Sequence, residues 1–245
     1  MTGPDPARGS DIARGQAPPL TDFETVLTTT RAVRRRLDFD RPVPREVVLE
    51  CLDLALQAPT GADSEDWRFV VVGDPDVKQA VGAEYRRAFD THVGPRLSGL
   101  LDTTGPVDGH ETPEAEAARL RKARVYSGAA HLAENIGRAP WLVLACAGRG
   151  RPTPANAASL YGSVFPAVWS FQLALRSRGL GSIITTLHLR EPDRVAEILG
   201  VPDDVTQCAL LPVAYTIGTD FRRAPRRPVA QVAFRDRWGQ PLDGG

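Results

Sequence analysis

Residues 58–67 read Ala-Pro-Thr-Gly-Ala-Asp-Ser-Glu-Asp-Trp, and about thirty residues upstream the chain reads Thr30-Arg31-Ala32-Val33-Arg34-Arg35-Arg36. Ala58-Pro59 ends a helix, because the residue before a proline disfavours the α conformation. The loop that follows is small and polar, and Trp67 leads into the apolar strand Phe69-Val70-Val71-Val72. Guanidinium groups bind phosphate through bidentate hydrogen bonds, and the backbone groups of a loop can form hydrogen bonds with the edge of a ring. The pair of segments therefore suits a ligand that joins a phosphate to a flat polar ring.

Composition excludes several classes of partner. The chain has 245 residues, with 30 basic and 30 acidic side chains and a formal net charge of zero. A balanced charge argues against a nucleic-acid surface or a basic membrane-binding face. The basic residues are 28 arginines and 2 lysines, so only arginines that cluster or fall in a motif carry weight.

Cysteine usage and hydropathy point to a cytoplasmic protein without a metal site. Three cysteines (Cys51, Cys146 and Cys208) lie far apart in apolar segments, which predicts buried thiols and neither a disulfide framework nor a zinc site. No apolar run approaches the roughly 18 residues of a membrane span. Residues 1–20 have no apolar signal region and are expected to be a disordered tail.

The remaining 225 residues, 21–245, are expected to form one α+β or three-layer α/β domain in which helices outnumber strands. Thr21 and Glu24 form a capping box for the first helix. Residues 92–112 lack periodicity and are expected to be a loop that acts as a substrate lid. Predicted helices cover residues 45–57, 76–90, 113–137, 155–178 and 191–199, and predicted strands cover 68–72, 140–147, 182–187 and 207–218.

Five segments in this order resemble the nitroreductase family of flavoproteins, over about residues 21–238. They are Thr30–Arg35 with Pro42-Val43-Pro44, Ala58–Gly61 with Trp67–Val72, Gly179–Ser182, Leu211–Tyr215 with Gly218, and Arg226-Arg227-Pro228. The resemblance implies a nitroreductase-like α/β/α sandwich with a mostly antiparallel sheet. It also implies an intertwined homodimer that binds FMN at its interface.

The family resemblance implies an oxidoreductase that takes hydride from NAD(P)H and reduces a nitroaromatic, quinone or similar conjugated acceptor. The chain has no Gly-x-Gly-x-x-Gly after a strand, so NAD(P)H is expected to bind transiently over the flavin. Alternatives are reductive dehalogenation, dehydrogenation of a small metabolite, a non-catalytic flavin-sequestering protein, and a scaffold that has lost flavin. The sequence names no catalytic side chain, physiological acceptor or nicotinamide preference.

Residue roles follow from the resemblance position by position. Arg31 and Arg34 match phosphate-binding arginines, and Arg226 matches a third basic contact. Ala32 stands where serine is common, so a hydroxyl contact is lost while its backbone N–H is retained. The other expected flavin contacts are Val33, Arg35, Pro59, Thr60, Gly61, Asp63, Ile184, Thr185 and Thr186.

Several of these residues also have an ordinary structural interpretation. Taken by itself, the Arg31–Arg36 run is as typical of a solvated basic helix end as of a phosphate site. Asp63 stands where asparagine is common, and its charge would repel a flavin carbonyl unless it points away. Trp67 is expected to lie in the core. His188 is the one histidine near the flavin-bordering strand that merits a test for proton donation, although packing is the favoured interpretation.

Overall fold

The computed structural model describes residues 22–101, 112–148 and 150–242. The expected tail at residues 1–20 and most of the expected lid lie outside these ranges. Thr21 also lies outside them; Asp22 is the N-cap of the first helix, and its carboxylate accepts from the Thr25 N–H at 2.9 Å. The elements in chain order are α1 (Phe23–Thr29), β1 (Leu37–Asp38), α2 (Arg45–Ala55), η2 (Gly61–Asp63), β2 (Trp67–Val72), α3 (Pro75–His92), α4 (Gly94–Leu101), α5 (Pro113–Asn135), η3 (Ile136–Arg138), β3 (Trp141–Ala147), α6 (Ala157–Ser177), β4 (Leu180–Gly181), η4 (Leu187–Arg190), α7 (Pro192–Leu199), β5 (Thr206–Thr216) and η5 (Val229–Gln231).

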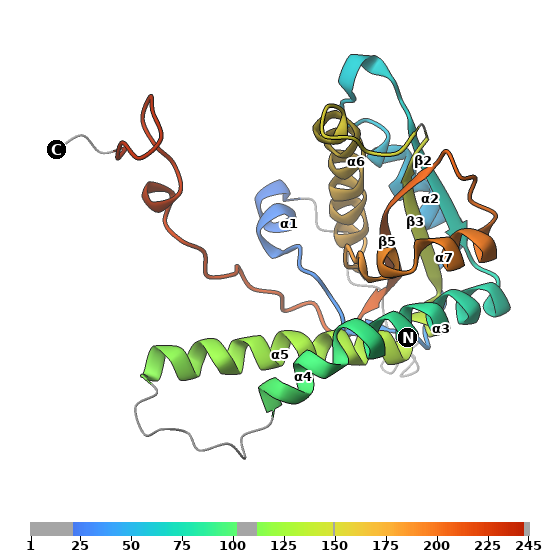
Figure 1. Ribbon diagram of the computed structural model, residues 1–245, viewed down its shortest axis with the longest axis horizontal. Coiled ribbons are helices and arrows are strands. Elements are labelled where there is room, and N and C mark those ends of the chain that lie inside the picture. Colours follow the sequence, from blue (N-terminus) through green and yellow to red (C-terminus); the bar gives the residue numbers. More distant parts are fainter. Residues whose placement is uncertain (1–21, 102–111, 149, 243–245) are drawn as a thin grey trace, which may run out of the picture.

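An antiparallel sheet with strand order β1-β5-β3-β2 lies at the centre, and β4 pairs with β5. Helices α2 and α6 pack on one face, and α3 and α5 pack on the other (Figure 1). Strand β3 shows why both faces are covered. Its side chains alternate between the two cores, with Val143, Ala145 and Ala147 in one and Leu142, Leu144 and Cys146 in the other. The predicted three-layer α/β/α sandwich with a mostly antiparallel sheet is confirmed.

The predicted strand at residues 182–187 is wrong, because this segment forms only isolated bridges after β4. The register that pairs Gly181 with Ala214 and Thr185 with Leu210 places Ile183 opposite Pro212. Proline has no N–H to donate to the ladder, so the strand is interrupted there. Ser182 pairs instead with the arginine-rich segment, where its carbonyl accepts a hydrogen bond from the Val33 N–H at 3.0 Å.

The predicted loop at residues 92–112 is wrong for its first part, where Gly94–Leu101 forms α4. Helix α4 and the first turns of α5 extend from the body of the molecule, and the segment after β5 also leaves the body (Figure 1). Within the described ranges, no helix has both the length and the hydropathy that a membrane crossing requires.

Candidate functional site

The arginine-rich segment runs extended beside the end of β4. Helix α1 ends at Thr29, and Thr30 has extended backbone angles (φ −62°, ψ 128°). Ala32 then forms a parallel bridge with Ser182. The segment is therefore fixed by backbone pairing, which leaves its arginine side chains free to reach different neighbours.

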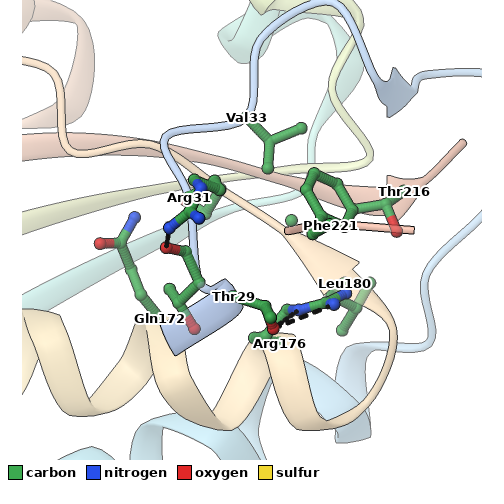
Figure 2. Close-up of a pocket in the computed structure, with 11 residues that line it drawn as sticks. Thr29, Arg31, Val33, Gln172, Arg176, Leu180, Thr216 and Phe221 are labelled. Carbon is green, nitrogen blue, oxygen red and sulfur yellow. Dashed lines mark hydrogen bonds between the residues drawn. The ribbon is translucent and has the colours of Figure 1, made fainter. Parts of the chain in front are cut away.

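Arg31 lines a narrow cleft between α1, the end of α6, β4 and the segment that follows β5 (Figure 2). Its Nη1 donates to the Thr28 and Thr30 carbonyls at 3.1 and 3.2 Å. Its Nη2 donates to the Arg222 carbonyl, which fixes the C-terminal segment over the cleft. Burial lowers the pKa of Arg31, and the positive charge of Arg226 lowers it further. Arg31 and Arg226 therefore lie close enough for their charges to interact.

Arg176 enters the same cleft from α6, and sequence reasoning missed it. Its side chain is buried, and its Nε and Nη2 donate to Thr29 Oγ1 at 3.3 and 3.2 Å (Figure 2). It lies over the Phe221 ring, with 4.6 Å between the guanidinium carbon and the ring centroid. One signal marks it in the sequence, since Arg176 is the single charged residue in the helix Ala157–Ser177.

The other three arginines of the cluster diverge. Arg36 pairs with Asp220 at 2.6 Å and stacks on Phe221. Arg35 donates to Ser127 Oγ on α5 at 2.6 Å. These two therefore hold the C-terminal segment and α5 in place.

Arg34 lies beside Gly128 of α5 and close to Tyr85 of α3. Its Cδ lies 3.4 Å from the position that a Cβ on Gly128 would occupy. Burial lowers the pKa of Arg34, and Tyr85 opposes this effect. Arg34 does not line the Arg31 cleft.

The loop after α2 has a strained backbone. Ala62, Asp63 and Glu65 have positive φ angles of 53°, 54° and 44°. Non-glycine residues in this region are uncommon and cost on the order of 1–3 kcal/mol each, so such strain persists where surrounding contacts impose it. One contact that holds the loop against the helix layer is the bond from the Gly61 N–H to Ser163 Oγ on α6 at 3.1 Å.

The side chains of Pro59 and Asp63 are exposed, and Thr60 is half-buried. Asp63 thus points to solvent, as its charge requires in this chain. A cavity of about 200 Å³ lies beside the contact between the loop and α6, and its wall includes Gly61, Ser64 and Asn156.

The segment after β4 places its three predicted contacts differently. Thr185 is buried, and its Oγ1 lies 2.7 Å from the Tyr85 hydroxyl. Ile184 is half-buried against the α2–α6 core, whereas Thr186 is exposed. His188 follows, fully buried, and neither ring nitrogen has a hydrogen-bond partner among the described residues. Burial lowers the pKa of His188 to about 4, so this imidazole is neutral at pH 7.

Comparisons with known proteins place the chain in a family. The model of the nitroreductase family matches residues 27–215, which is more than half of the chain. The chain belongs to the nitroreductase family. An NADH dehydrogenase of Thermus thermophilus is 29% identical over 204 residues, which cover 80% of this chain and 88% of that protein. An iodotyrosine deiodinase of Thermotoga neapolitana is 27% identical over 193 residues, which cover 77% of this chain and 86% of that protein.

A solved structure shares the nitroreductase fold with this chain. It is an oxidised iodotyrosine deiodinase bound to FMN and 3-iodo-L-tyrosine. The two superpose with a TM-score of 0.60 at 22% identity, over 87% of this chain and 98% of the other.

Proposed function

We propose that this chain is an FMN-dependent oxidoreductase that takes hydride from NAD(P)H and reduces a nitroaromatic, quinone or similar conjugated acceptor. The observation that carries the proposal is the cleft lined by Arg31 and Arg176. Arg226 lies close to Arg31, so positive charge is concentrated there. Membership of a flavoprotein family supplies the cofactor, which performs hydride chemistry when it is bound.

The residues present fit a phosphate at this position. Arg31 has five N–H donors, and its three hydrogen bonds go to neutral carbonyls. A phosphate dianion is a stronger acceptor for such donors than a carbonyl. We assign Arg31 and Arg226 to the phosphate, with Ala32 contributing its backbone N–H; the Val33 N–H is engaged by the Ser182 carbonyl, so Val33 contributes position only. Arg34 is assigned to the ring side of the flavin, because it lies outside the cleft and close to Tyr85, whose hydroxyl contacts Thr185.

The ring would be held by residues 59–63 and 184–186. Thr185 has a buried hydroxyl whose position is fixed by the hydroxyl of Tyr85. The strained loop offers the backbone of Pro59, Thr60, Gly61 and Asp63. These groups orient the flavin, and residues 21–245 act as a single flavin-binding domain.

Two observations favour a homodimer. Large apolar side chains are exposed on the segment after β5, including Trp238 at 91% and Val229 at 69%. Such a set on one arm is typical of a surface that a second copy covers. The second observation concerns α6, where Ser163 and Arg176 lie thirteen positions and about 20 Å apart. The loop of one subunit and the cleft of its partner therefore serve one ligand most readily across an interface.

A second candidate activity is reductive dehalogenation, favoured by the relative named iodotyrosine deiodinase. Dehydrogenation of a small metabolite and flavin sequestration without turnover are further candidates from the same scaffold. NAD(P)H as the donor is favoured by the relative named NADH dehydrogenase. A cytoplasmic location fits a donor of this kind.

One set of assays separates these candidates. The purified protein should be yellow, should elute as a dimer, and should oxidise NADH or NADPH in the presence of a nitroaromatic or a quinone. Bound flavin without turnover of either donor would reject the main proposal, and iodide release from 3-iodotyrosine under reducing conditions would favour dehalogenation. A colourless protein that fails to bind added FMN would reject every flavin-dependent function.

A further inference from the structure

We propose that Arg176 is a buried positive charge of the phosphate site, and that it makes the protein select FMN over flavins without a phosphate monoester. The inference rests on the proposed function, because it concerns the same cofactor. It assigns a role to a residue on α6, far in sequence from the arginine-rich segment.

The first support is the uncompensated charge of Arg176. The side chain is 6% exposed, and no carboxylate among the described residues lies within ion-pair distance of it. Its hydrogen-bond acceptors are neutral, namely Thr29 Oγ1 and the Thr219 carbonyl at 3.4 Å. A buried charge without a partner is costly, so its presence calls for a compensating anion.

The second support is the set of neighbouring charges. Burial lowers the pKa of Arg176, and the positive charges of Arg36 and Arg31 lower it further. Arg36 also lies over the Phe221 ring, and Asp220 neutralises its charge. Arg176 and Arg31 have no such acid in the described structure, so the excess positive charge is centred on the cleft that they share.

The third support is an unpartnered hydroxyl in the wall of the cleft. Ser182 is 4% exposed, and its Oγ makes no hydrogen bond with any described residue. The cleft has room for about 10 Å³, the space of one water molecule. The phosphate therefore lies at the mouth, beside Arg31, and a water in the cleft can link it to Ser182. Arg176 acts on the phosphate from beneath, through an interior of low dielectric constant.

A purely structural role for Arg176 makes a different prediction. The carbonyl end of α1 bears partial negative charge, and Arg31 and Arg176 both donate to its last turn. If Arg176 only caps this seven-residue helix, its loss should lower the stability of the protein and weaken the binding of all flavins equally. If Arg176 stabilises the bound phosphate, its loss should weaken the binding of phosphorylated flavins alone.

The charge of the ligand determines which flavin benefits. A phosphate monoester carries a charge of about −1.5 to −2 at pH 7. Riboflavin carries none, and each phosphate of the FAD pyrophosphate carries one. We therefore expect an order of affinity of FMN over FAD over riboflavin, with Arg176 responsible for part of the gap.

The experiment measures the dissociation constants of FMN and riboflavin by flavin fluorescence quenching in the wild type, Arg176→Met and Arg176→Lys. For Arg176→Met we expect FMN affinity to fall at least about tenfold, on the scale of a charge-assisted contact, while riboflavin affinity is unchanged. Arg176→Lys should recover part of the loss. Arg178→Met is the matched control, since it lies on the same helix end and faces Glu50 at 3.7 Å; both affinities should be unchanged.

Three outcomes separate the two proposals. A wild type that binds no flavin rejects the proposed function. A wild type that binds FMN, with equal loss of FMN and riboflavin in Arg176→Met or no loss at all, overturns the present inference and leaves the function intact. If Arg176→Met does not fold, a crystal structure of the wild-type FMN complex decides: a phosphate at the mouth of the Arg31–Arg176 cleft supports the inference, and a phosphate elsewhere overturns it.

Discussion

The hydroxyl of Tyr85 on α3 lies 2.7 Å from Oγ1 of Thr185, one hundred positions later in the chain, and both side chains are buried. Burial raises the pKa of Tyr85, so the phenol keeps its proton at neutral pH and can donate. The bond fastens the interrupted segment after β4 to the helix layer beneath it.

Replacing this donor tests the bond. Tyr85→Phe should lower the free energy of unfolding by about 1–3 kcal/mol, because Thr185 is left with a buried hydroxyl and one fewer partner. Denaturant titration measures the change. Tyr126→Phe on α5 is the control and should stay within about 0.5 kcal/mol. In the double variant with Thr185→Val the two losses should not add; additive losses would contradict a direct bond.

A close approach of α3 to η3 depends on glycine. A Cβ on Gly82 would lie 2.8 Å from Cα and 2.9 Å from N of Gly137, and backbone atoms cannot move aside as a side chain can. Gly82→Ala should therefore lower the free energy of unfolding by about 1–3 kcal/mol. A Cβ on Gly162 of α6 would meet nothing within 4 Å. Gly162→Ala should instead raise stability by about 0.5–1 kcal/mol, and equal effects at the two positions would contradict the packing of α3 on η3.

Acid should destabilise the protein partly through His188. Its pKa falls from 6.5 to about 4 on folding because burial penalises the charged ring. Between these values the unfolded chain binds more protons, so the stabilising effect is complete above pH 6.5 and is lost as pH falls toward 4. The loss amounts to about 3 kcal/mol at one pKa unit per 1.36 kcal/mol.

The comparison that isolates this contribution uses His188→Met, which removes the titrating ring and both unpartnered nitrogens. Its unfolding free energy, measured by urea titration from pH 7 to pH 4, should decline less steeply than that of the wild type. Parallel pH profiles for the two proteins would mean that His188 is solvated or partnered in solution.

The layers and most helices were predictable because their signals are local. Helix α2 follows from apolar periodicity, with an error of two residues at its end. Strand β3 follows from a continuous apolar run, since a strand covered on both faces need not alternate. Trp67 lies in the core as predicted.

The errors arose where a distant residue decides. Pro212 interrupts the strand predicted at 182–187, although it lies far along the chain and in a different strand. The Arg31–Arg36 run is similar, because backbone pairing with Ser182 sends each side chain to a different partner. Arg176 was missed because an isolated arginine in a helix gains meaning only when its burial and its lack of an acid are known.

The strained loop yields a prediction that joins stability to binding. Ala62 has φ 53° and ψ 28°, a conformation that costs an alanine about 1–2 kcal/mol and costs glycine little. Glycine also increases the conformational entropy of the unfolded chain, which lowers the free energy of unfolding by about 0.4–1 kcal/mol. Ala62→Gly should therefore raise the free energy of unfolding slightly, by roughly 0–1.5 kcal/mol. The exposed helical Ala83→Gly is the control, and it should lower stability by about 1 kcal/mol.

Flavin binding gives the loop its second readout. If the strained backbone holds residues 60–63 in place for the flavin ring, Ala62→Gly should weaken the binding of FMN and riboflavin by the same factor, since both carry the ring. The free energy of unfolding should not decrease. That pattern is the reverse of the one expected for Arg176→Met. A loss of stability equal to that of Ala83→Gly would mean that Ala62 does not adopt the left-handed conformation in solution. Unchanged flavin affinity in a more stable variant would place the ring away from this loop.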